Sequence, residues 1–232
     1  MLLDDGTWEI RGRRLRFPVR IRHARAACAT YPVGVGPARE LVAGTGLELV
    51  SVAGRTPLFL ALVDYRDGDL DAYGEVGVAF LARHRGRTGP YIHQLPVTRT
   101  FTMEAGRALW GLPKWLGEAE LVIDGPDARC RLADDRGRHV LTAALRALSP
   151  RLPGGVPGTV TALAPHEGGV FASTVRARVG GVRVGRAASL VLGHGHPMAE
   201  ELRALALPRR PLAVVTADRV SFEMDAALDV PR

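Results

Sequence analysis

The chain has 232 residues, of which 47% are hydrophobic and 24% are charged, a composition typical of a globular protein and unlike that of a disordered chain. Its formal net charge of +7 comes from arginines that are spread along the whole sequence among acidic residues. The densest arginine groups contain little aromatic surface on which bases could stack, so we expect no nucleic-acid partner.

Two further features narrow the class of protein. No stretch is long and apolar enough to span a membrane, and residues 1–16 lack the apolar centre of a secretory leader, so we expect a cytoplasmic protein with no membrane partner. Cys28 and Cys130 lie far apart, and neither belongs to a Cys-x-x-Cys motif. We therefore expect two free thiols rather than a disulfide framework or a zinc site.

Taken in chain order, the elements predict a mainly β protein of the α+β class. After a lead-in over residues 1–18, β-branched runs between turn residues predict strands at Val19–Tyr31, Leu47–Ala53, Pro57–Tyr65, Tyr73–Ala82, Tyr91–Met103, Glu118–Ile123, Asp127–Ala133, His139–Leu148, Val170–Val179, Val182–Leu192 and Pro211–Met224. Short helical segments are predicted at 38–42, 104–110 and 197–207, a loop at 149–158 and a hairpin turn at Gly180-Gly181. Many closely spaced strands with two or three brief helices indicate an antiparallel barrel or sandwich, in one domain over residues 1–232.

Lys114 is the single lysine of the sequence. Arginine can replace lysine in ion pairs, but its guanidinium stays protonated and cannot act as an amine nucleophile. Gly111 and Pro113 end the helix predicted before Lys114, which places the lysine where the chain enters the next strand. The neighbouring Trp, Leu and Pro side chains would desolvate the ammonium and favour the neutral amine. Lys114 is therefore our candidate for imine (Schiff-base) formation, the alternative being a stray lysine in an arginine-rich chain.

Glu75 is the candidate acid or base for such chemistry. It lies in the otherwise apolar run from Tyr73 to Phe80 and, in a strand, shares a face with Tyr73, Gly77 and Ala79. We expect its carboxylate to point into a cavity, although a glutamate at a sheet edge that pairs with an arginine has the same sequence pattern.

A substrate carboxylate would need a cationic anchor, and a guanidinium can bind it through two hydrogen bonds. Arg22 and Arg25, on the first long strand, are the candidates. Arg107 is closer to Lys114 in sequence but is more typical of a structural residue on a short helix.

Other groups of residues give weaker indications of a functional site. His194 and His196, with His166, are potential metal ligands, but His-Gly-His-Pro before a helix is more simply a loop and a helix entry. The Gly-x-Gly segments at 34–36 and 44–46 lack the strand, turn and helix of a dinucleotide site, and no Gly-x-Ser-x-Gly motif is present.

The motifs Tyr73-Gly74-Glu75, Gly106-Arg107 and Gly111-Leu112-Pro113-Lys114 resemble those of the acetoacetate decarboxylase family, and the similarity extends to the segment from His196 to Leu202. The resemblance implies an antiparallel β-cone or barrel that encloses the site, a homo-oligomer, and chemistry without metal or cofactor. It assigns the Schiff-base role to Lys114 and an acid/base or positioning role to Glu75. Tyr73 and Trp115 join Arg22 and Arg25 as expected substrate contacts.

Two positions depart from the family pattern. The decarboxylases have a second lysine after the nucleophile, where this chain has Trp115, and a glutamate after Gly-Arg, where it has Ala108. Without the neighbouring cation, desolvation alone must favour the neutral amine. The sequence predicts a cofactor-independent lyase acting on a small keto acid, first of all by decarboxylation of a β-keto acid. A pyruvate-type aldolase-dehydratase using the same lysine and a non-catalytic ligand-binding barrel are the alternatives.

Overall fold

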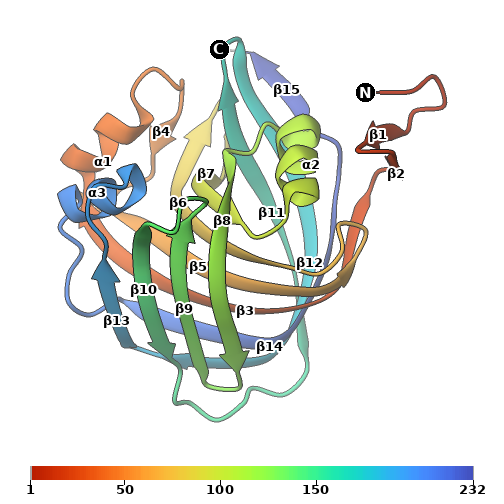
Figure 1. The fold of residues 1–232 in the computed structure, drawn as a ribbon. Coiled ribbons are helices and arrows are strands. Elements are labelled where there is room, and N and C mark those ends of the chain that lie inside the picture. Colours follow the sequence, from red (N-terminus) through yellow and green to blue (C-terminus); the bar gives the residue numbers. More distant parts are fainter. Residues whose placement is uncertain (1, 232) are drawn as a thin grey trace.

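The computed structural model describes residues 2–231, which form one large, curved, mainly antiparallel sheet, a small separate two-stranded sheet and short helices (Figure 1). The strands are β1 Trp8–Ile10, β2 Arg13–Leu15, β3 Val19–Gly34, β4 Glu48–Leu49, β5 Arg55–Gly68, β6 Tyr73–His84, β7 Arg87–Val97, β8 Lys114–Asp124, β9 Asp127–Asp134, β10 His139–Arg146, β11 Gly155–His166, β12 Gly169–Gly185, β13 Ala187–Leu192, β14 Ala213–Met224 and β15 Leu228–Pro231. The helices are α1 Val35–Val42, α2 Thr100–Trp110 and α3 Pro197–Ala204.

The strand pairings describe a cone-like barrel with a side extension. Strands β7, β11, β12, β14, β3, β5 and β6 follow one another, and β6 pairs again with β7. The ring is weakest between β7 and β11, which share a single parallel pair, Tyr91 with Leu163. Strands β8, β9, β10 and β13 continue the sheet from β7. The predicted antiparallel β-cone with two or three short helices is confirmed.

Strand periodicity explains where the core lies. Leu58, Leu60 and Leu62 of β5 alternate with less buried residues and are fully buried. Strand β6 is buried on both of its faces along most of its length. Two apolar clusters result, and the second of them, which includes Tyr65 and Tyr73, surrounds the candidate site.

Several predicted elements end elsewhere in the structure. The strand expected to reach Met103 ends at Val97, and α2 already begins at Thr100. The last four residues of the expected loop 149–158 belong to β11. The hairpin predicted at Gly180-Gly181 is wrong: β12 runs through both glycines, and β14 pairs with it on either side of Gly181, whose φ is +65°.

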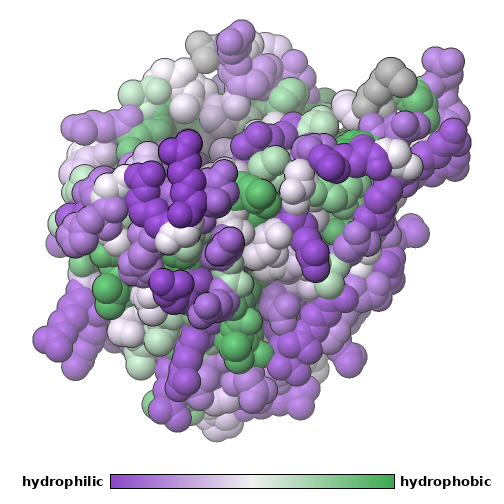
Figure 2. Space-filling view, in the orientation of Figure 1, coloured by the Kyte–Doolittle hydropathy of each residue, from purple (hydrophilic) through white to green (hydrophobic). Residues whose placement is uncertain are grey.

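The polarity of the protein surface agrees with the dispersion of charged residues along the sequence. The face in Figure 2 is mostly hydrophilic, with small apolar areas scattered over it. Most of the ion pairs among residues 2–231 join exposed arginines to acids, and such pairs each contribute little to stability. None of the three helices within residues 2–231 combines the length and the apolar composition that crossing a bilayer requires.

Candidate active site

Lys114 opens β8 directly after the turn that ends α2. Gly111 takes the left-handed conformation, with a φ of 64°, and its N–H donates to the carbonyl of Arg107. Two residues later Pro113 leads into the strand, so the predicted end of the helix and entry into the sheet are confirmed. The side chain of Lys114 is only 3% exposed.

Glu75 reaches Lys114 from β6. The Nζ atom of Lys114 donates a hydrogen bond to Oε2 of Glu75 at 2.8 Å, and the hydroxyl of Tyr65 donates to Oε1 of the same carboxylate at 2.9 Å. Nζ also lies 5.1 Å from the centroid of the Tyr73 ring, within the range of a cation–π contact. The amine and the carboxylate are thus held together by groups from three strands.

The two tyrosines are stacked on each other, with their ring centroids 4.2 Å apart. Burial raises the pKa of the Tyr65 phenol well above its ordinary value, and the negative charge of Glu75 raises it further. The same two causes raise the pKa of Tyr73. Both phenols therefore stay protonated at neutral pH, and Tyr65 remains a hydrogen-bond donor to Glu75.

These residues line a cavity of about 150 Å³, whose wall is built by residues of β3, β5, β6, β7, β8, β11, β12 and β14 and of the end of α2. Eleven of its fifteen lining residues are apolar: Val19, Ile21, Leu70, Ile92, Leu95, Trp110, Leu112, Ala162, Val175, Phe222 and Met224. Tyr65, Tyr73, Glu75 and Lys114 are the other four. An apolar cavity of about this size in another protein holds benzene, so the space suits a ligand of roughly six or seven non-hydrogen atoms.

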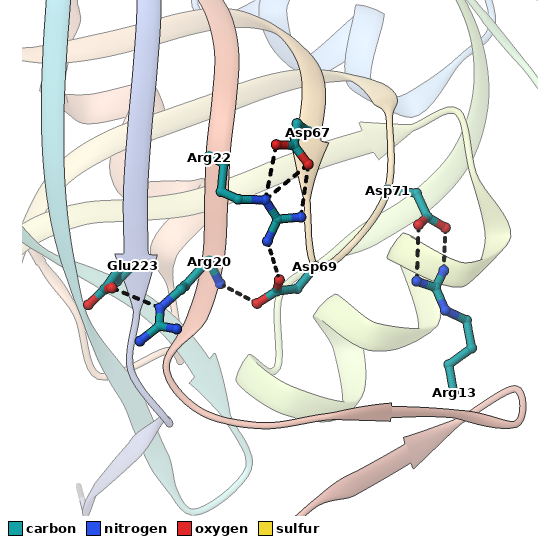
Figure 3. Close-up of polar contacts among 7 residues, drawn as sticks. All are labelled: Arg13, Arg20, Arg22, Asp67, Asp69, Asp71 and Glu223. Atoms are coloured by element: carbon teal, nitrogen blue, oxygen red, sulfur yellow. Dashed lines mark hydrogen bonds and ion pairs between the residues drawn. The ribbon is translucent and has the colours of Figure 1, made fainter.

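The arginine anchors expected from the sequence lie elsewhere. Arg22 is exposed and is bound by Asp67 and Asp69, in the network of surface ion pairs shown in Figure 3. Arg25 donates to the carbonyl of Ile123 and approaches Asp124 at 3.6 Å. The structure brings neither guanidinium to the cavity. Among the described residues that line it, Lys114 alone is a cation.

Trp115 also lies away from the cavity. Neighbouring residues of a strand point to opposite faces of the sheet, and the Trp115 indole packs against the His196 ring with centroids 5.0 Å apart. Its Nε1 donates to Oε1 of Gln94 at 3.0 Å. The position that holds the second lysine in the family therefore faces a different environment from Lys114 in this chain.

The sequence analysis missed Tyr65. Its backbone lies directly opposite Tyr73 in the antiparallel pair formed by β5 and β6. The signal was available, because the strand predicted at Pro57–Tyr65 ends with one of these tyrosines. The strand predicted at Tyr73–Ala82, after a short connection, begins with the other. What was missing was the register that makes them partners.

Several solved structures have a fold similar to that of this chain. A structure of acetoacetate decarboxylase matches with a TM-score of 0.66 at 19% identity, over 94% of this chain and 91% of that one. The enduracididine biosynthesis enzyme MppR matches with a TM-score of 0.69 at 18% identity, over 94% and 89% of the two chains. Acetoacetate decarboxylase from Legionella pneumophila matches with a TM-score of 0.69 at 16% identity, over 94% and 90%.

These identities are low, and the structural likeness shows the fold alone. No curated protein matches the sequence. The family model described as acetoacetate decarboxylase matches residues 12–219, which is most of the chain. The protein therefore belongs to the acetoacetate decarboxylase family.

Proposed function

We propose that the protein is a Schiff-base lyase in which Lys114 forms an imine with a small β-keto acid and releases carbon dioxide. The observation that carries the proposal is the buried hydrogen bond of 2.8 Å between Lys114 and Glu75, inside a small and mainly apolar cavity. A buried amine beside a proton acceptor has what imine chemistry requires, a route to the neutral nucleophile.

In the first step the ammonium of Lys114 transfers a proton to Glu75. The transfer removes two charges from an apolar cavity, where charges are poorly solvated. The neutral amine adds to the ketone carbon of the substrate. Glu75 then returns the proton to the resulting hydroxyl, which leaves as water, so that the iminium ion and the Glu75 carboxylate remain. The hydrogen bond from Tyr65 keeps this carboxylate turned toward the amine.

In the second step the bond between the carboxylate and its neighbouring carbon breaks. Its electron pair moves into the iminium, giving a neutral enamine and carbon dioxide. One proton from solvent, delivered through Glu75, goes to the enamine carbon, and water hydrolyses the new iminium to release the ketone and regenerate the Lys114 ammonium. The step that breaks the bond converts a zwitterion into two neutral molecules, so the apolar lining favours it.

The alternative aldol reaction requires a different charge distribution around the substrate. MppR has been solved with pyruvate and with the condensation product of pyruvate and imidazole 4-carboxaldehyde. A pyruvate carboxylate stays charged throughout such a reaction and benefits from a cation beside it. Because Lys114 is the one cation among the described residues that line the cavity, the lining favours decarboxylation over aldol chemistry.

Borohydride trapping tests the proposal. Sodium borohydride reduces an imine to a stable amine, so intact mass spectrometry of the protein treated with acetoacetate or with pyruvate reports the adduct. We expect a mass gain after incubation with acetoacetate, and carbon dioxide release in the absence of borohydride. Lys114→Arg is the matched control, because it keeps the charge and removes the nucleophile.

The outcomes separate the alternatives. An adduct with pyruvate alone would favour the aldolase-dehydratase. An adduct of equal size in Lys114→Arg would exclude Lys114 as the nucleophile. If a panel of small carbonyl compounds bound without forming an adduct, the protein would be a non-catalytic ligand-binding barrel.

A further inference from the structure

The last turns of α2 contact Lys114 both at its main chain and along its side chain. Arg107 reaches the carbonyl oxygen of Lys114, and Gly106 faces the methylene groups that carry the amine. We propose that Gly106 and Arg107 are positioning residues that fix the Lys114 amine for attack on a carbonyl compound. This inference rests on the proposed function, since it concerns how the imine-forming lysine is held.

Arg107 strengthens a weak part of the sheet. Strand β8 joins β7 through only three parallel pairs, Leu95 with Lys114, Pro96 with Trp115 and Val97 with Leu116. One of the three β7 residues is a proline, which has no N–H to give to a neighbouring strand. The Nε atom of Arg107 donates to the Lys114 carbonyl at 2.6 Å, and so ties the first residue of β8 to α2. The main chain of Lys114 is thereby held from the helix as well as from β7.

Gly106 provides the space for the lysine side chain. A Cβ atom at this position would lie 2.5 Å from Cδ and 2.6 Å from Cε of Lys114, whereas ordinary contacts begin at 3.4 Å. Glycine is unfavourable inside a helix, so its presence in a buried part of α2 calls for a local reason. The passage of the lysine chain across the helix supplies that reason.

The two contacts together set where Nζ lies. They hold the lysine at both ends of the path from its carbonyl to Cε, and Nζ then falls at 2.8 Å from Glu75. A methyl group on residue 106 must move the methylene groups by about 1 Å to reach an ordinary contact distance. A displacement of about 1 Å from a reactive geometry can reduce a rate by about 100-fold.

Gly106→Ala tests the steric part of the inference. The atoms that the new methyl group would meet belong to a flexible side chain, so the protein should still fold, as judged by circular dichroism and urea unfolding. We expect the rate of borohydride-trapped adduct formation to fall by about 100-fold. Gly36→Ala is the matched control, because Gly36 lies in α1 with nothing within 4 Å of the added Cβ, and its rate should equal that of the wild type.

Arg107→Met and Arg107→Gln test the tether. Methionine keeps a side chain of similar shape without a donor, whereas glutamine retains an N–H group. We expect Arg107→Met to lower kcat with little change in KM, and Arg107→Gln to recover part of the loss. A role in folding alone would not lower kcat while leaving KM unchanged, and a side chain with a donor would not restore the loss. The Arg107 variants also provide a second test should Gly106→Ala fail to fold.

The outcomes distinguish this inference from the proposed function. If the wild type forms no adduct, the proposed function fails and the positioning inference with it. If the wild type forms the adduct and folded Gly106→Ala forms it at the same rate, the lysine needs no space at residue 106 and the steric part is overturned. A wild-type kcat in Arg107→Met would overturn the tether.

Discussion

Removing both partners of the Lys114–Glu75 pair should destabilise the protein much less than the two single substitutions predict. The side chains are 3% and 9% exposed, so either partner left alone would be a buried charge without compensation. Breaking a buried pair in this way typically costs about 3–5 kcal/mol. We expect Lys114→Met and Glu75→Leu each to lose about that much unfolding free energy.

The double variant places two apolar side chains in a cavity that already has eleven apolar residues in its lining. Replacing a buried ion pair by apolar residues is often neutral or stabilising. The Tyr65 hydroxyl would lose its acceptor, which costs about 1–3 kcal/mol. The two single losses sum to about 6–10 kcal/mol, and the double variant should lose no more than about 3 kcal/mol. The coupling energy is therefore at least about 3 kcal/mol.

Urea unfolding followed by circular dichroism, with the slopes of the four proteins compared, measures this cycle. The exposed pair of Arg20 and Glu223 supplies a control cycle, with side chains 59% and 42% exposed. Its coupling should lie below about 1 kcal/mol. If the losses at Lys114 and Glu75 simply add, to within about 0.5 kcal/mol, the reasoning about the buried pair is refuted.

Three further measurements test other parts of the structure. Tyr65→Phe removes the hydrogen bond to Glu75 and should slow decarboxylation by about 10- to 100-fold, and an unchanged rate would show that the hydroxyl has no orienting role. Burial alone would raise the pKa of Glu201, but hydrogen bonds from a histidine and a glutamine of β7 bring it below the ordinary value of 4.5. Stability should therefore fall as the pH drops below about 4.5, and acid unfolding in Glu201→Gln should depend less on pH; equal slopes would contradict this. Burial raises the pKa of Cys28 and of Cys130 to about 12, so a thiol reagent at neutral pH should label neither in the native protein and both after unfolding.

The arginines illustrate why part of the site could not be predicted from the sequence. Strand β3 places Val19 and Ile21 in the cavity wall, and its pairing with β5 then shifts register around His23. Such an irregularity inserts a residue and changes which side chains face inward, so counting alternate positions beyond it cannot assign Arg25. Arg22, next to Ile21, faces outward as alternation predicts. The opposite orientation of Trp115 to Lys114 likewise follows from strand alternation alone.

The sequence by itself determined the β-rich fold class, the inward face of β6 that carries Glu75, and the entry of Lys114 into a strand after a helix stop. These features depend on local periodicity, on glycine and proline, and on a lysine that occurs once. Only the tertiary structure decided that Lys114 meets Glu75, that Tyr65 joins them, and that α2 holds the lysine through Gly106 and Arg107. Those contacts depend on strand register and on how a helix packs against a strand, which are set by the burial of the whole apolar core rather than by any one segment.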